Sequence, residues 1–183
     1  MTEKCEGCGS DSCEPTITDF ITGEKTPDTL AERVRQKTER FLVEDKNYSK
    51  SDIEVGIEFE VASGGETYRP SADLIINMEG KRVVIIKCIY GSLTAGERLT
   101  LSYARLLDSY QIPFAIITNG VETDVLDTVS GNVIGSGADA IPSKDELNPG
   151  ELKFIEYPKE RVEKEKRILA AFESIDEAMC SNL

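Results

Sequence analysis

Residues 69–90, RPSADLIINMEGKRVVIIKCIY, constrain the fold more than any other part of the chain. Two apolar runs flank Glu79-Gly80, a pair typical of a tight hairpin turn. The second run, over about residues 83–90, is apolar on both faces, which predicts a strand in the middle of a sheet. The first run, over about residues 68–78, carries one charge near its centre, Asp73. The stretch therefore predicts two adjacent strands with a single carboxylate among apolar side chains.

The flanking segments predict a mixed α/β sheet. Residues 53–61 alternate between apolar and mostly acidic side chains, so the apolar residues from Ile53 to Val61 should share the buried face of one strand. Residues 113–118, PFAIIT, predict another buried strand, and a helix over residues 94–110 precedes it. A buried strand, a helix and a second buried strand pair in parallel through a right-handed crossover. Residues 122–127 and 132–134 predict a short hairpin at the end of this sheet.

The sequence predicts that the chain divides into three segments. Residues 1–27 are rich in Cys, Gly, Ser, Thr, Asp and Pro and are interpreted as a tail. Residues 28–150 form the α/β domain, which opens with a helix that Asp28 caps and that ends near Lys46. Residues 151–183 form an extension whose charged helix, over 159–180, packs on the domain through an apolar stripe. The stripe consists of Val162, Leu169, Phe172, Ile175 and Met179.

Length and charge limit the function classes. The chain has 183 residues, enough for one domain with a hydrophobic core, and no apolar run long enough to span a membrane. Its first ten residues do not resemble a secretory signal, which favours a cytoplasmic, reducing setting. The formal net charge is −13, and no third of the chain is basic. This balance predicts at most weak non-specific binding to nucleic acid, apart from any local basic cleft.

Asp73 suits the chemistry of a metal-dependent nuclease. Such a site uses carboxylates to hold a divalent cation and a basic group to orient or stabilise the attacking hydroxide. An aspartate on one strand and Glu-x-Lys on the next supply these groups, because residues two apart on a strand share a face. A structural alternative for Asp73 is an ion pair with Lys87 or Arg69.

Residues 32–127 resemble the N-terminal nuclease domain of type I restriction enzyme R subunits, which falls within the PD-(D/E)XK superfamily. The resemblance rests on several segments that follow in the family's order. They are the helix start at Glu32-Arg33-Val34-Arg35, ADLII, EGKRVVIIKC, YARLL, and PFAIITNG followed by ETDVLD. The resemblance implies a restriction endonuclease-like mixed sheet flanked by helices, Mg²⁺-dependent cleavage of DNA, and other protein subunits or nucleic acid as partners.

The same resemblance implies that the active site is degenerate. The family's third strand ends in Glu-Cys-Lys, and these three positions fall on Lys87, Cys88 and Ile89. Taking Lys87 as the motif lysine places Ile85 at the glutamate position, so the second carboxylate is missing in either register. The glutamine that the family often carries on the next helix is also absent, since that region reads Arg98-Leu99-Thr100.

The replacement predicts an ion pair in place of a metal. In the family register Lys87 lies beside Asp73, where its ammonium repels Mg²⁺ and satisfies the carboxylate. Three functions follow. The first is a non-catalytic binding or regulatory module. The second is a divalent-metal endonuclease with a rearranged site that uses Asp73, Lys87 and Glu32, with Glu58 and Glu60 as other candidate ligands. The third is a partner-binding protein that uses the C-terminal helix or the cysteine tail.

The cysteine tail predicts either a structural metal site or a disordered segment with free thiols. Cys5, Cys8 and Cys13 have the spacing C-x2-C-x4-C, whose first pair suits zinc or an iron–sulfur cluster. The chain has no His, so a fourth ligand has to come from elsewhere. The candidates are Cys180, which is preferred because chain ends often lie close together, Cys88, Asp11 and water.

Overall fold

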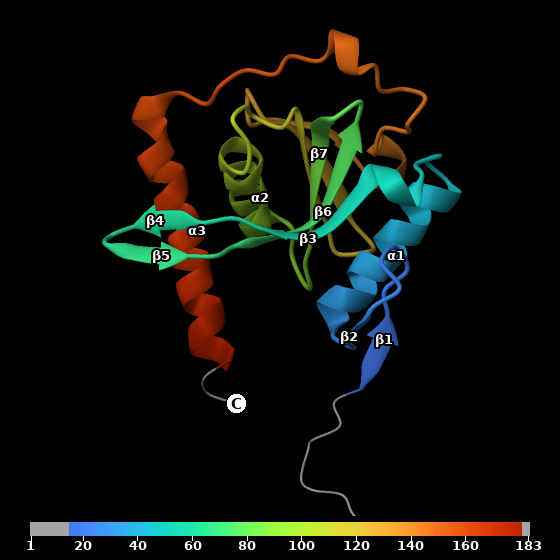
Figure 1. Cartoon of the computed structure of the whole chain (residues 1–183), viewed down its shortest axis with the longest axis horizontal. Coiled ribbons are helices and arrows are strands. Elements are labelled where there is room, and N and C mark those ends of the chain that lie inside the picture. Colours follow the sequence, from blue (N-terminus) through green and yellow to red (C-terminus); the bar gives the residue numbers. More distant parts are fainter. Residues whose placement is uncertain (1–14, 181–183) are drawn as a thin grey trace, which may run out of the picture.

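A computed structural model describes residues 15–180, without the side chains of Ala95 and residues 175–180. A six-stranded mixed sheet forms its centre, in the order β10-β9-β8-β7-β6-β3 (Figure 1). Its strands are β3 (Ile53–Glu58), β6 (Ser71–Met78), β7 (Lys81–Cys88), β8 (Phe114–Thr118), β9 (Thr123–Asp127) and β10 (Val133–Ser136). Only β7 and β8 pair in parallel within this sheet. The predicted mixed α/β sheet is confirmed.

The hairpin that holds Asp73 forms as predicted. β6 and β7 pair antiparallel around Glu79 and Gly80, which have φ angles of 53° and 76°. Two consecutive residues with positive φ suit the right-handed twist of the strands that they join. β7 lies between β6 and β8, and its residues from Val83 to Ile86 have no exposed surface. The apolar run on both faces of this strand therefore reflects its central place.

Three α-helices cover the two faces of the sheet. α1 (Leu30–Glu44) lies on one face, while α2 (Thr94–Leu106) and α3 (Lys159–Cys180) lie on the other (Figure 1). α2 ends earlier than the predicted boundary at residue 110. Thr29 caps α1, because its side chain accepts the N–H of Glu32 at 3.1 Å. The predicted cap, Asp28, instead binds the Arg33 guanidinium at 2.6 Å.

The strand predicted over residues 53–61 ends at Glu58, and its alternation of faces breaks at Gly56. Gly56 has a φ of +62°, a left-handed conformation that glycine adopts without strain. Ile53 and Val55, before this glycine, belong to the core beneath α1, whereas Ile57 and Phe59 belong to the core beneath α2. The five apolar side chains therefore do not share one face, as strict alternation had predicted.

Two small hairpins lie outside the central sheet. β4 (Val61–Ser63) pairs with β5 (Glu66–Tyr68), and this pair lies beside α3 (Figure 1). β1 (Thr16–Thr18) pairs with β2 (Lys25–Pro27) inside the segment interpreted from the sequence as a tail. Strands of three residues are too short to show a hydrophobic period, so this hairpin was not predicted.

The C-terminal part of the chain returns across the molecule. After β10 the chain runs from the α1 side to α3 through two 3-10 helices, Ala138–Ala140 and Pro149–Glu151 (Figure 1). A third 3-10 helix, Lys50–Asp52, precedes β3. α3 has the predicted bounds and packs against α2 and β4, with Leu169 fully buried. No helix in the described residues is long and apolar enough to cross a membrane.

Candidate functional site

Asp73 and Lys87 meet at the end of the β6–β7 hairpin. Leu74 pairs with Ile86 in this ladder, and the next positions along the two strands are Asp73 and Lys87. The Lys87 Nζ lies 2.9 Å from the Asp73 Oδ1, and the Cys88 N–H donates to Oδ2 at 2.6 Å. Lys87 also donates to the Ser71 carbonyl at 3.0 Å. The expected ion pair is present, and both carboxylate oxygens of Asp73 have protein donors.

Aromatic side chains surround the ion pair on the α2 side. The Lys87 Nζ lies 5.0 Å from the centre of the Tyr103 ring, and Phe59 meets this ring edge-on at 5.8 Å. Only 14% of the Lys87 side chain and 21% of the Asp73 side chain are exposed. An ammonium over an aromatic face is stabilised by the ring quadrupole, which holds Lys87 in this orientation.

Cys88, one of the candidate fourth ligands of the cysteine site, is the last residue of β7. It is buried, and its Sγ lies 3.8 Å from the Thr38 hydroxyl on α1. Burial, followed by the negative charge of Asp73, raises the pKa of the Cys88 thiol well above its usual range. The thiol is therefore protonated at neutral pH and is a poor metal ligand here.

The glutamates considered as substitute ligands have other positions. Glu32 binds the Arg35 guanidinium at 2.6 Å and accepts from the Gln36 amide at 2.8 Å. Glu58 is exposed at the end of β3, and Glu60 forms an exposed pair with Arg69 at 2.9 Å. Among the described residues, no group of three or more His, Cys, Asp or Glu side chains is placed to hold a metal ion.

A comparison of the sequence with known protein families finds a match. The sequence profile of the type I restriction enzyme R protein N terminus matches residues 31–142. The chain belongs to this family. The match includes α1, the hairpin of Asp73 and Lys87, and the β7–α2–β8 unit, and it ends before α3. No curated protein and no solved structure is significantly similar to the chain.

The cysteine site falls outside the described structure. Cys5, Cys8 and Cys13 precede residue 15, where the description begins, and Cys180 is the last residue of α3 with its side chain not described. The expectation of zinc or an iron–sulfur cluster at these cysteines therefore stays a prediction for this member of the family.

A buried network around Glu165 was not predicted from the sequence. This carboxylate on α3 has 1% of its side chain exposed. It accepts from Arg98 at 2.5 Å, Tyr157 at 2.5 Å and Ser102 at 2.7 Å, and it lies 3.3 Å from Arg105. Burial alone would raise the pKa of Glu165, but the hydrogen bonds and the charge of Arg98 outweigh it and lower the pKa. The network fastens α3 to α2.

A second network connects the N-terminal hairpin to α1. In this network carboxylates outnumber cations, whereas in the Glu165 network cations outnumber carboxylates. Arg35 lies 2.8 Å from Asp19, 2.6 Å from Glu32 and 2.9 Å from Glu39, so one guanidinium meets three carboxylates. Glu39 is fully buried, and its Oε2 has no hydrogen bond of normal geometry among the described residues. Burial, together with the negative charges of Asp19 and Glu32, raises the pKa of Glu39 to about 7 against the attraction of Arg35.

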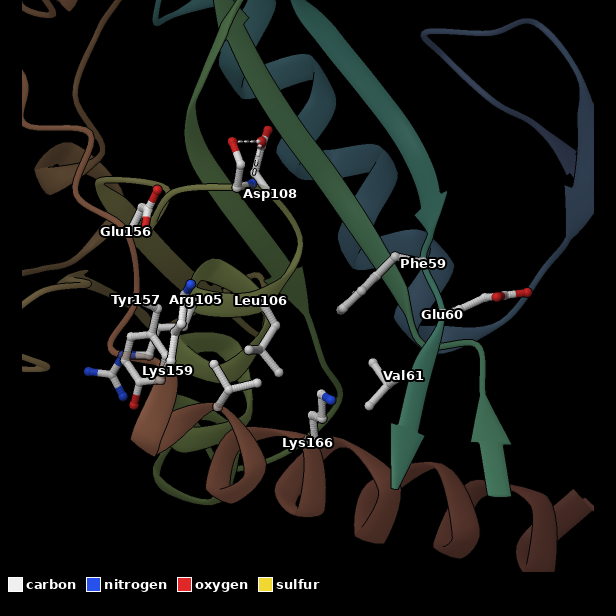
Figure 2. A pocket seen from close by; sticks show the side chains of 12 residues that line it. Phe59, Glu60, Val61, Arg105, Leu106, Asp108, Glu156, Tyr157, Lys159 and Lys166 are labelled. Atoms are coloured by element: carbon white, nitrogen blue, oxygen red, sulfur yellow. Dashed lines mark hydrogen bonds between the residues drawn. The ribbon is translucent and has the colours of Figure 1, made fainter. Parts of the chain in front are cut away.

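The cavity between α3 and the β3–β4 segment does not include the ion pair. It holds about 400 Å³, and Figure 2 shows Phe59 and Val61 on one side of it and Arg105 and Tyr157 on the other. Its three basic and three acidic lining residues balance in charge. Neither Asp73 nor Lys87 lines this cavity.

Proposed function

We propose that this domain keeps the scaffold of a PD-(D/E)XK nuclease but has lost its metal site, and that it acts as a non-catalytic binding or regulatory module. The observation that carries this proposal is the Lys87 ammonium 2.9 Å from the Asp73 carboxylate, at the position where the family motif has a metal-binding glutamate. A divalent cation needs oxygen ligands, and a fixed positive charge at this distance opposes its binding.

The remaining contacts of Asp73 support the same conclusion. Its second oxygen accepts the Cys88 N–H, so a metal would have to displace two donors rather than one. Loss of the Lys87 contact would also leave a partly buried ammonium with only the Ser71 carbonyl as a hydrogen-bonding partner. Such displacement costs free energy, because a partly buried charge loses its partner.

The family gives the class of partner. Domains of this family belong to R proteins of restriction enzymes, so the proposed partners are other protein subunits of such an enzyme or nucleic acid in a cytoplasmic setting. The net charge of −13 makes any nucleic-acid contact local and weak. The alternative function is a divalent-metal endonuclease with a rearranged site, and it makes the opposite prediction in a cleavage assay.

The test is incubation of supercoiled plasmid with the purified full chain and Mn²⁺. The proposal predicts that the plasmid stays supercoiled, with the same background for the wild type and for Asp73→Asn. Nicking by the wild type that Asp73→Asn abolishes would establish the endonuclease alternative instead. Equal nicking by both proteins would identify a contaminating nuclease, and repurification to constant background then restores the comparison.

A further inference from the structure

A second cavity gathers basic side chains on this acidic protein. It lies where the first turns of α3 meet α2 and the turn that follows β9, and it holds about 580 Å³. Its charged lining residues are the cations Arg98, Arg105, Arg161 and Lys164 and the carboxylates Glu156 and Glu165. Four cations and two carboxylates leave a formal charge of +2 in the cavity, whereas the whole chain carries −13.

The inner wall of this cavity is fixed by hydrogen bonds. Glu165 is saturated by its donors and orients both Arg98 and Arg105. Arg105 also donates to the Thr128 carbonyl at 2.9 Å, and its guanidinium lies 5.4 Å from the centre of the Tyr157 ring. Figure 2 shows Arg105 and Tyr157 next to each other. Basic groups that are held in place before a ligand arrives lose little conformational entropy when it binds.

The outer wall carries cations that are free to bind a ligand. Arg161 and Lys164 are exposed and lie three residues apart on α3, so they project from one side of the helix. Neither side chain forms an ion pair with any of the side chains that the structure describes. Their charges are therefore not neutralised by the protein, in contrast to those of Arg98 and Arg105.

We propose that this cavity binds a phosphate-bearing anion. A surplus charge of +2 matches a phosphate group, which carries close to two negative charges near neutral pH, better than it matches a single carboxylate. Guanidinium and ammonium groups are the side chains that bind phosphate oxygens most strongly. A volume of about 580 Å³ exceeds that of one phosphate, so the ligand carries several phosphates or a larger group beside one.

The proposal is independent of the lost metal site. Asp73 and Lys87 do not line this cavity, and the family match ends at residue 142, before Arg161 and Lys164. Nuclease activity in a cleavage assay would refute the proposed function but would not affect the proposed anion site. Absence of anion binding would in turn not affect the proposal about the Asp73–Lys87 ion pair.

The test is isothermal titration calorimetry of the full chain with tripolyphosphate at low ionic strength. The double variant Arg161→Ala, Lys164→Ala should lose at least about tenfold in affinity, because two charge-assisted contacts are removed. The matched control is Lys25→Ala, Lys37→Ala, which removes the same charge at exposed positions on β2 and α1, outside the cavity. Its affinity should stay within about twofold of the wild type, since the charges it removes are remote from the ligand and screened by solvent.

A third variant tests whether removal of a negative charge from the cavity strengthens anion binding. Glu156 is an exposed carboxylate on the cavity wall, so Glu156→Gln should raise the affinity for tripolyphosphate by about threefold through loss of repulsion. A short single-stranded oligonucleotide is then added as a competitor. Competition identifies nucleic acid as a source of the phosphate, and its absence identifies a small polyphosphate compound. No binding of tripolyphosphate by the wild type, or equal losses in the two double variants, would overturn the proposal.

Discussion

Glu165 and Asp73 are both carboxylates that basic side chains neutralise, but their surroundings differ. Glu165 is buried between two helices and has four donors, two of them arginines. Asp73 lies at the end of a hairpin, keeps 21% of its side chain exposed and has two donors. The difference shows that paired carboxylates have two distinct roles in this molecule. The Glu165 network holds α3 in place, whereas the Asp73 pair occupies the position at which we propose that a metal site was lost.

The largest predicted effect belongs to Glu165→Ala. It leaves the nearly buried Arg105 without its carboxylate, and removal of one partner of a buried pair costs about 3–5 kcal/mol of unfolding free energy. Urea denaturation followed by circular dichroism measures the loss. The matched control is Glu163→Ala on the same helix, whose pair with Lys166 is largely exposed and should contribute less than about 1 kcal/mol. Equal costs for the two variants would contradict the structural role of the Glu165 network.

A smaller, pH-dependent effect is predicted for Glu39. Its pKa is about 7 in the folded chain and near 4.5 when unfolded, so the protonated form is favoured by folding. The wild type should therefore lose up to about 3 kcal/mol of stability as the pH rises from about 4.5 to about 7. Glu39→Gln cannot ionise and should lack this loss, which makes it the more stable protein above pH 7 and nearly equal at pH 4.5.

Thermal denaturation of both proteins across this pH range measures the difference. Glu44→Gln, at an exposed position of the same helix, serves as the control and should follow the wild type at every pH. The result tests the contrast between Glu39 and Glu165. Several donors bind the single carboxylate of Glu165, whereas Glu39 shares the Arg35 guanidinium with two other carboxylates. Parallel curves for Glu39→Gln and the wild type would show that Glu39 is not held in its neutral form.

The smallest predicted effect belongs to Lys87→Met. The variant keeps most of the aliphatic stem over Tyr103 and removes the ammonium, so Asp73 retains only the Cys88 N–H. Because the pair is partly solvated, we expect a loss of about 1 kcal/mol in chemical denaturation. A loss as large as that of Glu165→Ala would mean that the Asp73 pair is also a main support of the fold.

The sequence predicts the Asp73 site better than the networks around it. The apolar runs, the Glu79-Gly80 turn and the family register together place Lys87 beside Asp73, because strand pairing follows from local sequence. The bounds of α3 also follow, from its many charged residues and the helical period of its apolar residues. These features depend on residues that are close in sequence.

The missed features depend on residues that are far apart. Glu165 meets Arg98 across 67 positions and Asp19 meets Gln36 across 17, and no periodic pattern marks either contact. Glu165 is one acidic residue in a helix rich in Lys and Glu, so its burial has no signal in composition. Gly56 reads as an ordinary member of an alternating strand, and only its positive φ shows that the buried face changes there.

The most direct test of the central claim is a thermal-shift titration with Mg²⁺ and with Mn²⁺. The ion pair predicts that the melting temperature of the wild type does not change beyond the effect of ionic strength. Lys87→Glu restores a second carboxylate beside Asp73, and a metal at ten times its dissociation constant should then raise the stability by about 1.4 kcal/mol. Lys153→Glu makes the same charge change at an exposed site and should show no gain. A saturable, metal-specific rise in the wild type, abolished by Asp73→Asn, would contradict the account.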